Sequence, residues 1–512
     1  MTLKEFVKEY KFQKKLVIYN SDELYNRECA LCAEDDVPVI NCEGEYLLSV
    51  ARNIVVKYYA VLGKWFEEID ENNQAGMIMA LALKLIHENK LSYFKESMID
   101  SGTAQQVTTD INILRREKKL DRLQNHTDSK LSDIYIIASD YIKTIESDEV
   151  LDSVSILKKA IEALDRDISY LNADLVTIYD DAYNEFSCLE KEFYAKLINN
   201  KSNLGNIISS SSIPKKQPQK SLFKVFGLNN EIHAVVKDVL KKGIPWERVQ
   251  LVVCNTDRLY PMITYLKELN IPYYLPEGVT EQYEYISAYI RRYLENRANF
   301  DFDKNKVNIR ISFQSLAEKL KERANNGKIP ENQVITFLNK AEICDKNARL
   351  YEFNADYNVA IKFMNDVLLG EMTHEKSKTE SGSLYIASLM KTETIFRPHV
   401  YFLGFEARNY PGSHMQSSVL LDKDMKELGL DERYMSTGKS QKEVERVKRL
   451  LESDAEYITI SYVSYDSVHM REQNPSSVYQ EELQSNHIQE NKFGFTAANK
   501  DDVMELREWV LL

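Results

Sequence analysis

The stretch SLFKVFGLNNEIHAVVKDVLKKGIPWERVQLVVCN, residues 221–255, indicates the fold class most directly. It opens on an apolar run typical of a buried strand and continues into NEIHAVVKDVLKKG, where apolar residues recur at helical spacing. It closes on a second apolar run, RVQLVVCN. The helical pattern LYPMITYLKELN and the strand-like IPYYLPEG follow at residues 259–278. Alternation of strands and helices in this order predicts an α/β unit.

The rest of the second half extends this unit and interrupts it once. Residues from about 281 to 380 carry charged surfaces and one apolar face per segment, which predicts a helical insertion. Buried strands return in SGSLYIASLM, RPHVYFLGF and YITISYVSY, the last at residues 457–465. Residues 221–512 are therefore predicted to form one α/β domain with a helical insertion.

The first half has a similar pattern. KLVIYN at residues 15–20 and VPVINC at residues 37–42 are predicted strands, and the apolar run LVTIY at residues 175–179 is a third. Helical periodicity separates the second strand from the third, and the stretch SSSSIPKKQPQK follows as a linker. The predicted parts are a first α/β domain at 1–210, its helical insertion at about 45–170, and the linker at 211–220.

The composition favours helices and an ordinary globular protein. Gly (16) and Pro (11) are 27 of 512 residues, well below the roughly 12% that these two usually contribute. The 66 Lys+Arg and 79 Asp+Glu give a net charge of −13, which mildly favours protein partners over nucleic acid. No apolar run approaches the roughly 18 residues of a membrane span, and the start MTLKEFVKEYKFQKK lacks the apolar centre of a signal peptide. We therefore expect a cytoplasmic, helix-rich α/β protein without a membrane partner.

The cysteines do not predict a cofactor. Cys29 and Cys32 form one CxxC, but no second pair follows and no histidine lies at metal-ligand spacing from them. We interpret both as ordinary thiols. The motifs HExxH, GxSxG and GxGxxG are also missing from the sequence, so we predict no catalytic, metal or cofactor residue in this chain.

A nucleotide-dependent motor would need a glycine-rich phosphate loop of the form GxxxxGK[ST]. Gly438-Lys439-Ser440 has the required ending, but Arg433 stands at the position of the first glycine. The surrounding YMSTGKSQKEVE predicts the start of a helix instead. After the strand KLVIYN, where such a loop belongs, the next glycine is Gly44. We predict that the phosphate loop is absent.

Two segments have the positive charge that phosphate contacts require. Residues 193–230 contain no Asp or Glu but six lysines, and the predicted helix INILRREKKLDRL at residues 111–123 carries five basic residues. Taken alone, each segment is more readily a solvated linker or helix face. From the acid-free segment, the candidate nucleic-acid contacts are Lys215, Lys216 and Lys220.

Three segments together resemble a known family. RPHVYFLGFEARNYPG at residues 397–412 resembles the part of UvrD-like superfamily 1 helicases where a strand ends in Gly, a few residues and then Pro. ITISYVSYDSVHMREQNPSSVYQEEL at residues 458–483 resembles the Ser-Tyr and Pro-Ser-Ser segments of AddB-like proteins, the inactivated helicase subunits of AddAB-type helicase/nucleases. Residues 229–255 are similar to the segment that opens the family's second motor-like domain, with Glu231 at its usual acidic position.

The resemblance implies two RecA-like motor-type domains that each carry a helical insertion and lack the phosphate loop. By alignment, Ser453-Asp454-Ala455 stands where active helicases have Thr-Arg-Ala, and an aspartate in place of that arginine would repel ATP. Full-length AddB-like proteins also have a C-terminal PD-(D/E)xK nuclease domain with an iron–sulfur cluster. Neither is recognisable in this chain, so the cluster is expected only with a further C-terminal region.

The function implied by the resemblance is that of a catalytically inactive helicase-like subunit region. Such a region would bind single-stranded DNA, form a heterodimer with an AddA-like helicase/nuclease subunit, and act in double-strand break processing and recombinational repair. The DNA contacts that the resemblance implies are Lys391, Thr392, Arg397, Ser461 and Tyr465.

Other functions stay open on the sequence alone. An active ATP-dependent helicase that uses Gly438-Lys439-Ser440 would lose ATP hydrolysis in Lys439→Ala. An adaptor of a DNA repair complex that binds only protein would have no DNA affinity even at low salt. A nuclease would need a metal-binding acid cluster with a lysine on an adjacent strand.

Overall fold

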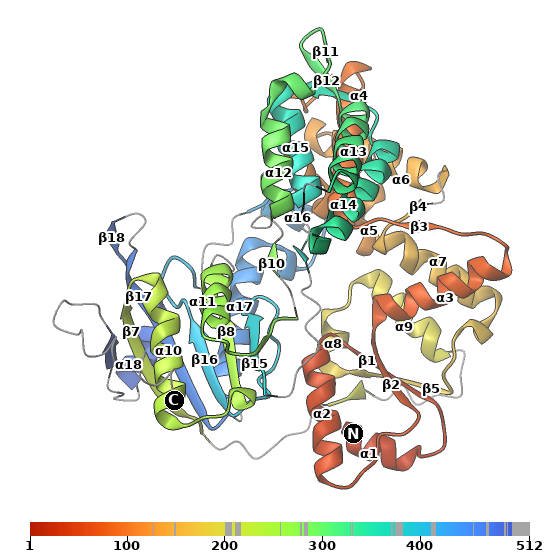
Figure 1. Ribbon diagram of the computed structural model, residues 1–512. Helices are drawn as coiled ribbons and strands as arrows, with labels where there is room; N and C mark the ends of the chain where they lie inside the picture. The colour runs from red at the N-terminus through yellow and green to blue at the C-terminus, as the bar shows by residue number, and fades with distance from the viewer. Residues whose placement is uncertain are drawn as a thin grey trace.

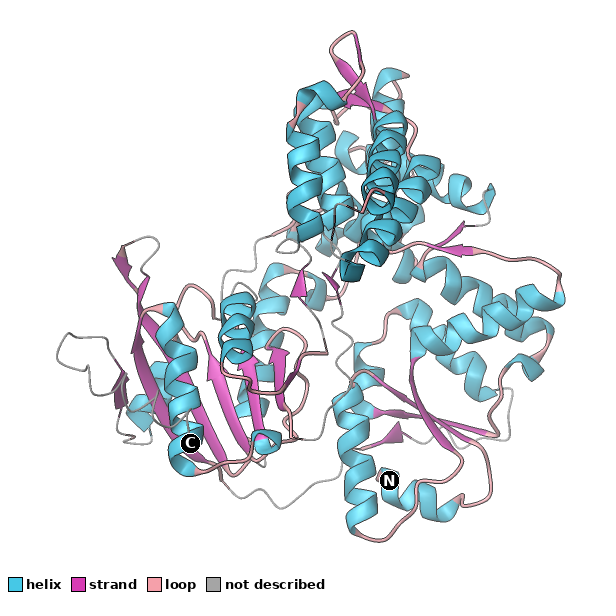
Figure 2. Cartoon of the chain, viewed as in Figure 1, coloured by secondary structure: helices cyan, strands magenta, loops and turns pink. Residues whose placement is uncertain are grey.

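The computed structural model describes most of the chain. It covers residues 1–493 except for 125, 148–149, 200–206, 210–216, 256–257, 277–278, 281–284, 328, 330, 370–371, 374–381, 411–415, 454, 467–469, 486–487 and 489. The predicted helix-rich α/β class is confirmed, because many helices surround two sheets of mainly parallel strands (Figures 1 and 2).

The first sheet is parallel, with strand order β2-β1-β5-β6. Its strands are β1 (Lys15–Tyr19), β2 (Cys42–Tyr46), β5 (Leu175–Tyr179) and β6 (Ile207–Ile208). Every residue of β1 and β5 is buried, as expected for inner strands that are covered on both faces. The strand predicted at 37–42 is wrong, since the chain pairs with β1 only from Cys42 onward.

Helices from two parts of the chain pack on the first sheet. They are α1 (Leu3–Glu9), α2 (Asp22–Glu34), α3 (Leu47–Val61), α7 (Ser153–Arg166), α8 (Asp180–Glu185) and α9 (Cys188–Asn199). The apolar faces of α3 and α7 share one core with β1 and β5. Both helices lie within the range 45–170 that was predicted as an insertion, yet they are part of the first sheet's core.

The second sheet has the order β19-β7-β17-β16-β8-β15-β9, and these strands are all parallel. A short antiparallel strand, β18, pairs with the end of β17. The bounds are β7 (Gln219–Phe226), β8 (Val249–Val253), β9 (Tyr273–Tyr274), β15 (Leu384–Ser388), β16 (His399–Leu403), β17 (Tyr457–Asp466), β18 (Arg471–Glu472) and β19 (Glu490–Phe493). The last two residues of the predicted linker, Gln219 and Lys220, therefore belong to β7.

Helices cover both faces of the second sheet. On one face lie α10 (Leu228–Lys242) and α11 (Leu259–Glu268), and on the other lie α17 (Ser436–Leu451) and α18 (Ser477–Ser485). Alternate residues of β8 enter the two cores, with Leu251 and Val253 on the α10 side and Val252 on the α17 side. This layered packing explains why the strands are continuous apolar runs in the sequence.

The remaining helices form a third body, the helical region, which lies at the top of Figure 1. Its helices are α4 (Glu71–His87), α5 (Ser101–Arg116), α6 (Ser129–Ser147), α12 (Tyr285–Glu295), α13 (Ile309–Asn325), α14 (Glu331–Leu350) and α15 (Tyr357–Leu369). Three of these come from the first half of the chain and four from the second, and their apolar side chains form a single core that Met425 of the short helix α16 (Asp422–Glu427) also enters.

Helices from the two halves of the chain pack closely against each other at Gly76. A Cβ atom at Gly76 of α4 would lie 2.7 Å from the ring of Tyr351, and the Tyr351 hydroxyl hydrogen bonds to the side-chain oxygen of Asn73 at 2.8 Å. The two predicted insertions are thus packed against each other instead of projecting separately. Within the part of the chain that the structure describes, no helix is both long and apolar enough for a membrane crossing.

Candidate functional site

The three segments that carry the family resemblance meet at the carboxyl edge of the second sheet. Glu231 lies in the first turn of α10, Gly404 directly follows β16, and Ser461 lies in β17. A carboxylate oxygen of Glu231 accepts hydrogen bonds from the Gly404 backbone N–H at 3.0 Å and from the Ser461 hydroxyl at 2.5 Å. Carboxyl ends of parallel strands are the usual ligand-binding edge of open α/β sheets, so this edge is our candidate site.

Arg258 holds the centre of the site. Its guanidinium group makes ion pairs with Glu231 and with Glu406, the latter at 2.6 Å. The three side chains are 8%, 3% and 0% exposed, so all of these charges are buried. Glu406 also accepts hydrogen bonds from the backbone N–H of Val463 at 2.6 Å and from the Asn409 amide at 2.5 Å. We call Glu231, Arg258, Glu406 and Ser461 the buried cluster.

The electrostatics of the buried cluster are those of a structural network. Burial raises the pKa of Glu231, although the nearby Arg258 charge opposes this. For Arg258, burial lowers the pKa, but the two carboxylates outweigh it and the net direction is upward. The carboxylates accept bonds from the backbone at Gly404 and Val463, so the cluster fixes the strand ends.

Gly404 is required by this geometry. Its φ of +91° is unfavourable for residues with a side chain, and a Cβ atom there would lie 2.9 Å from Arg258 Nε. The turn that follows β16 therefore closes directly over the buried guanidinium group.

An aromatic pair lies at the same edge. The rings of Phe226, at the end of β7, and Tyr465, near the end of β17, are stacked with centroids 4.9 Å apart and an interplanar angle of 7°. Phe226 is 47% exposed. Two largely exposed arginines, Arg408 and Arg471, approach the carboxylate of Asp466 at 3.7 and 3.9 Å. We call Phe226, Tyr465, Arg408 and Arg471 the aromatic platform.

The sequence-predicted DNA contacts do not form one surface. Lys391 is exposed and Thr392 is fully buried, and both follow the end of β15. The Thr392 hydroxyl donates to the Ser388 carbonyl at 2.8 Å, so it is satisfied internally. Ser461 is fully buried in the cluster, and Tyr465 is the predicted contact that belongs to the aromatic platform.

Two other predicted contacts lie at the opposite, amino edge of the sheet. Arg397 precedes β16, and its guanidinium group donates to the carbonyls of Trp246, Val249 and Ser383 at 3.2, 3.1 and 2.5 Å. Burial lowers the pKa of Arg397 to about 10. Lys220, near the start of β7, pairs with Glu482 at 2.5 Å. Lys215 and Lys216 lie outside the described residues.

The basic helix predicted at 111–123 ends earlier in the structure, and ion pairs occupy part of its charge. Helix α5 ends at Arg116, and Arg115 is buried against Asp152. Lys118 pairs with Glu192. These charges are therefore partly neutralised within the protein and do not form a free basic stripe.

Sequence reasoning missed most residues of the site. The sequence does not predict five residues of the site, which are Phe226, Arg258, Glu406, Arg408 and Arg471. The first four lie at or just after the end of a strand. The one pattern that could have indicated these site residues is a charged residue a few positions after an apolar run. Partners more than 140 positions apart, such as Arg258 and Glu406, could not be paired without the fold.

The carboxyl edge of the first sheet has a different character. Strand β1 passes into α2 through only Asn20 and Ser21, and the Ser21 hydroxyl caps the helix by accepting from the Leu24 N–H at 3.3 Å. The rings of Tyr19 and Tyr25 stack beside this link, with centroids 5.2 Å apart. The edge is thus filled by a helix cap and aromatic rings.

The remaining motifs have structural explanations. Gly438 lies in the first turn of α17, as the predicted helix start requires, and a Cβ atom there would be 2.0 Å from the Glu432 carbonyl oxygen. Burial raises the pKa of the Cys29 and Cys32 thiols in α2, which is opposite to the shift of a reactive thiol. Among the described residues, no group of three or more His, Cys, Asp or Glu side chains is placed to hold a metal ion.

The comparisons do not place the chain in a family. Neither a scan against protein-family models nor a search of curated proteins finds a match.

Proposed function

We propose that this chain is a catalytically inactive helicase-like region with two RecA-like domains, and that it binds single-stranded DNA through the second sheet. In this proposal it acts as a scaffold in a cytoplasmic helicase/nuclease complex that processes double-strand breaks for recombinational repair. Its partner would be an active helicase/nuclease subunit of the AddA type.

The observation that carries the proposal is the convergence of the three resembling segments. Residues 229–255, 397–412 and 458–483 are separated in sequence, yet Glu231, Gly404 and Ser461 from these segments are joined by direct hydrogen bonds. These hydrogen bonds support the proposal because they place residues of all three resembling segments in one site.

The first sheet supports the inactive character. A phosphate loop wraps nucleotide phosphates with backbone N–H groups between a strand and a helix. Here the link between β1 and α2 is two residues long, and Ser21 caps the helix. A link of two residues has too few backbone N–H groups to surround a triphosphate.

The aromatic platform is the part of the site best suited to single-stranded DNA. Phe226 is 47% exposed, and stacking of a base on such a ring is a contact that tolerates any base. Arg408 and Arg471 share a single carboxylate, Asp466, and so leave positive charge for a phosphate. The ring stack and the two arginines thus supply stacking and charge at successive residues of β17, Tyr465 and Asp466.

The test is fluorescence anisotropy of a labelled single-stranded oligonucleotide titrated with the full chain at several salt concentrations, with and without ATP. We expect binding that weakens steeply with salt and does not respond to ATP. Absence of binding at the lowest salt would contradict the DNA-binding role and favour an adaptor that contacts only protein. DNA-stimulated ATP hydrolysis that is lost in Lys439→Ala would favour an active helicase.

Variants of the platform make the test specific. Phe226→Ala and Tyr465→Ala should each weaken binding by about 5- to 150-fold, the range for loss of one stacked base. Arg408→Ala should weaken binding and reduce the salt slope by about 0.7, as expected for one phosphate contact on a single strand. Arg310→Ala is the matched control, because Arg310 is also an exposed arginine paired with a carboxylate, but it lies in α13 of the helical region.

A further inference from the structure

The helical region contains a cavity of about 610 Å³ where the two halves of the chain meet. Helices α4 and α6 line it from the first half. Strand β12 (Lys306–Asn308), the end of α14 and the start of β13 (Asn354–Asp356) line it from the second. Small-molecule sites usually have volumes of about 300–1,000 Å³, so the space suits a small organic ligand. We call it the α4 cavity.

The walls of the α4 cavity are largely apolar. Met77 and Leu83 of α4 and Phe353 after α14 are lining side chains that are at most 9% exposed. Leu81 and Leu350 also line it and are half-buried. Such walls favour the apolar body of a ligand, because apolar surface is more stable when it is removed from water.

The carboxylates of Glu88 and Glu352 at the cavity are already paired with cations. Glu88 pairs with Lys90 at 2.6 Å, and Glu352 pairs with Arg310 at 3.2 Å. Both cations belong to residues outside the cavity lining. An anionic ligand would therefore meet carboxylates whose charge is compensated.

The basic residues of the lining are not all engaged. Lys306 pairs with Glu96 at 2.5 Å, and the Nε2 atom of His87 lies 3.5 Å from the same carboxylate. The ammonium group of Lys84 has no ion-pair or hydrogen-bond partner among the residues that the structure describes. Side chains of a helix lean toward its N-terminus, so Lys84 extends toward the part of the wall that Ala80 forms one turn earlier.

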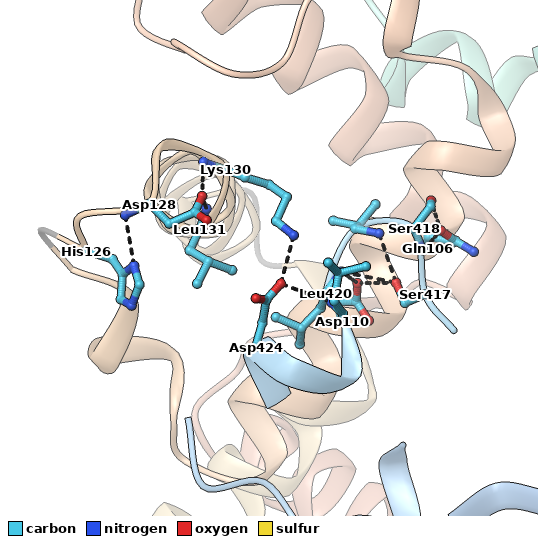
Figure 3. A network of polar contacts seen from close by, with 12 residues as sticks. Gln106, Asp110, His126, Asp128, Lys130, Leu131, Ser417, Ser418, Leu420 and Asp424 are labelled. Atoms are coloured by element: carbon cyan, nitrogen blue, oxygen red, sulfur yellow. Dashed lines mark hydrogen bonds and ion pairs between the residues drawn. The ribbon is translucent and has the colours of Figure 1, made fainter. Parts of the chain in front are cut away.

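Two other lysines bridge the halves of the chain, and both are paired. Lys130 of α6 lies 2.8 Å from the carboxylate of Asp424, in a position where both side chains are about one tenth exposed (Figure 3). Lys346 of α14 pairs with Glu67 at 2.9 Å. Lys84 differs from both, because its charge is uncompensated and lies beside an open apolar space.

We propose that the α4 cavity binds a small organic anion, with its apolar body against the walls and its head group on Lys84. An ammonium group pairs with a carboxylate or a phosphate as a point charge, so the ligand is an apolar carboxylate or phosphate monoester. At about 30 Å³ for each water-sized group, the cavity holds a ligand of roughly 20 non-hydrogen atoms. The inference goes beyond the proposed DNA binding, because the α4 cavity lies in the helical region and not at the second sheet.

The first experiment is a fluorescence titration of the full chain with anilinonaphthalene sulfonate, an anion with an aromatic body of similar size. We expect saturable binding to a single site. Decanoate and decyl phosphate, below their micelle concentrations, should displace the dye, whereas decyltrimethylammonium, with the same chain and a cationic head group, should not. Displacement by only one of the two anions would support the proposal and identify the head group. Absence of dye binding, or equal displacement by the cation, would overturn it.

Variants assign the binding to the α4 cavity. Lys84→Glu, at an exposed position, should weaken dye binding by about 5-fold or more, because it removes one ion pair and adds repulsion. Ala80→Trp places an indole ring in the cavity and should abolish binding. Lys426→Glu is the matched control, because Lys426 is also an exposed helix residue of the helical region but does not line the cavity.

Urea denaturation gives a second measurement. A ligand that binds only the folded chain raises its stability, so decanoate should raise the urea midpoint of wild type and of Lys426→Glu, and should raise that of Lys84→Glu less. If Ala80→Trp does not fold, Lys84→Glu still tests the proposal. Dye affinity and decanoate shifts in Lys84→Glu that equal those of the wild type would overturn it.

Discussion

Replacing Arg258 by methionine tests whether the buried cluster holds the second sheet together. The substitution removes the cation between Glu231 and Glu406 but keeps most of the side-chain volume. Both carboxylates are at most 3% exposed, so neither can be solvated without opening the sheet edge. Breaking one buried ion pair costs about 3–5 kcal/mol. Because Arg258 serves two carboxylates, we expect a loss of about 4 kcal/mol at pH 7.

The pH dependence of this loss has a definite sign. Without Arg258, the guanidinium charge no longer opposes the effect of burial, which raises the pKa of Glu231, so the folded variant gains a proton at mildly acidic pH. The destabilisation should therefore shrink between pH 7 and pH 5 and return as the pH rises. Combining Arg258→Met with Glu231→Gln and Glu406→Gln should recover about half of the loss, because no unpaired charge remains buried.

The assay is urea denaturation followed by the fluorescence of Trp246, which packs against the core of the second sheet. Trp65→Phe and Trp509→Phe in the background make Trp246 the single tryptophan of the chain. Arg310→Met, which breaks an exposed Arg–Glu pair, should cost less than about 1 kcal/mol. A loss below about 1 kcal/mol in Arg258→Met at pH 7, or one that is unchanged at pH 5, would refute the reasoning.

Three further substitutions have expected outcomes, two of them in the same denaturation assay and the one in the first sheet in a hydrogen-exchange measurement. Gly404→Ala should destabilise the second sheet by about 1–3 kcal/mol, whereas Gly243→Ala, also at positive φ but with nothing within 4 Å of the new Cβ, should cost about 1 kcal/mol. Gly44→Ala places a Cβ 2.5 Å from the Tyr25 ring and should destabilise the first sheet, measured by hydrogen exchange of β1, by about 2 kcal/mol or more. Arg397→Met removes the guanidinium group that donates to three carbonyls, so the free energy of unfolding should fall by about 2 kcal/mol. The oligonucleotide affinity of the folded variant should not change, because Arg397 lies at the opposite edge of the sheet from the aromatic platform.

The inner strands were predictable from the sequence because of their burial. KLVIY, LVTIY and HVYFL are continuous apolar runs, as strands of a parallel sheet covered on both faces must be. The failure at β2 has the same origin. This edge strand, CEGEY, is only partly buried and is selected by pairing with β1, so the more apolar VPVINC nearby was the better match to the pattern.

The joint helical core could not be predicted from periodicity. Each amphipathic pattern shows that a helix buries one face, but it does not show which partner covers that face. Gly76 and Tyr351 are contact partners from opposite halves of the chain, and neither has a local signal. Residues 417–435 have the same property, since their apolar side chains follow β16 in sequence but complete the core of another body.

The buried cluster bears on the fold of the second sheet, whereas the aromatic platform bears on what its carboxyl edge binds. A buried carboxylate such as Glu231 is costly without Arg258, so the stability of this strand edge depends on both residues together. Resemblance at such positions therefore speaks for the fold and not for what the edge binds. The platform residues Phe226 and Arg408 are exposed, and their loss would leave the sheet intact while removing stacking and charge. A stable Phe226→Ala protein that binds the oligonucleotide as well as wild type would contradict the DNA-binding role proposed for this edge without bearing on the fold.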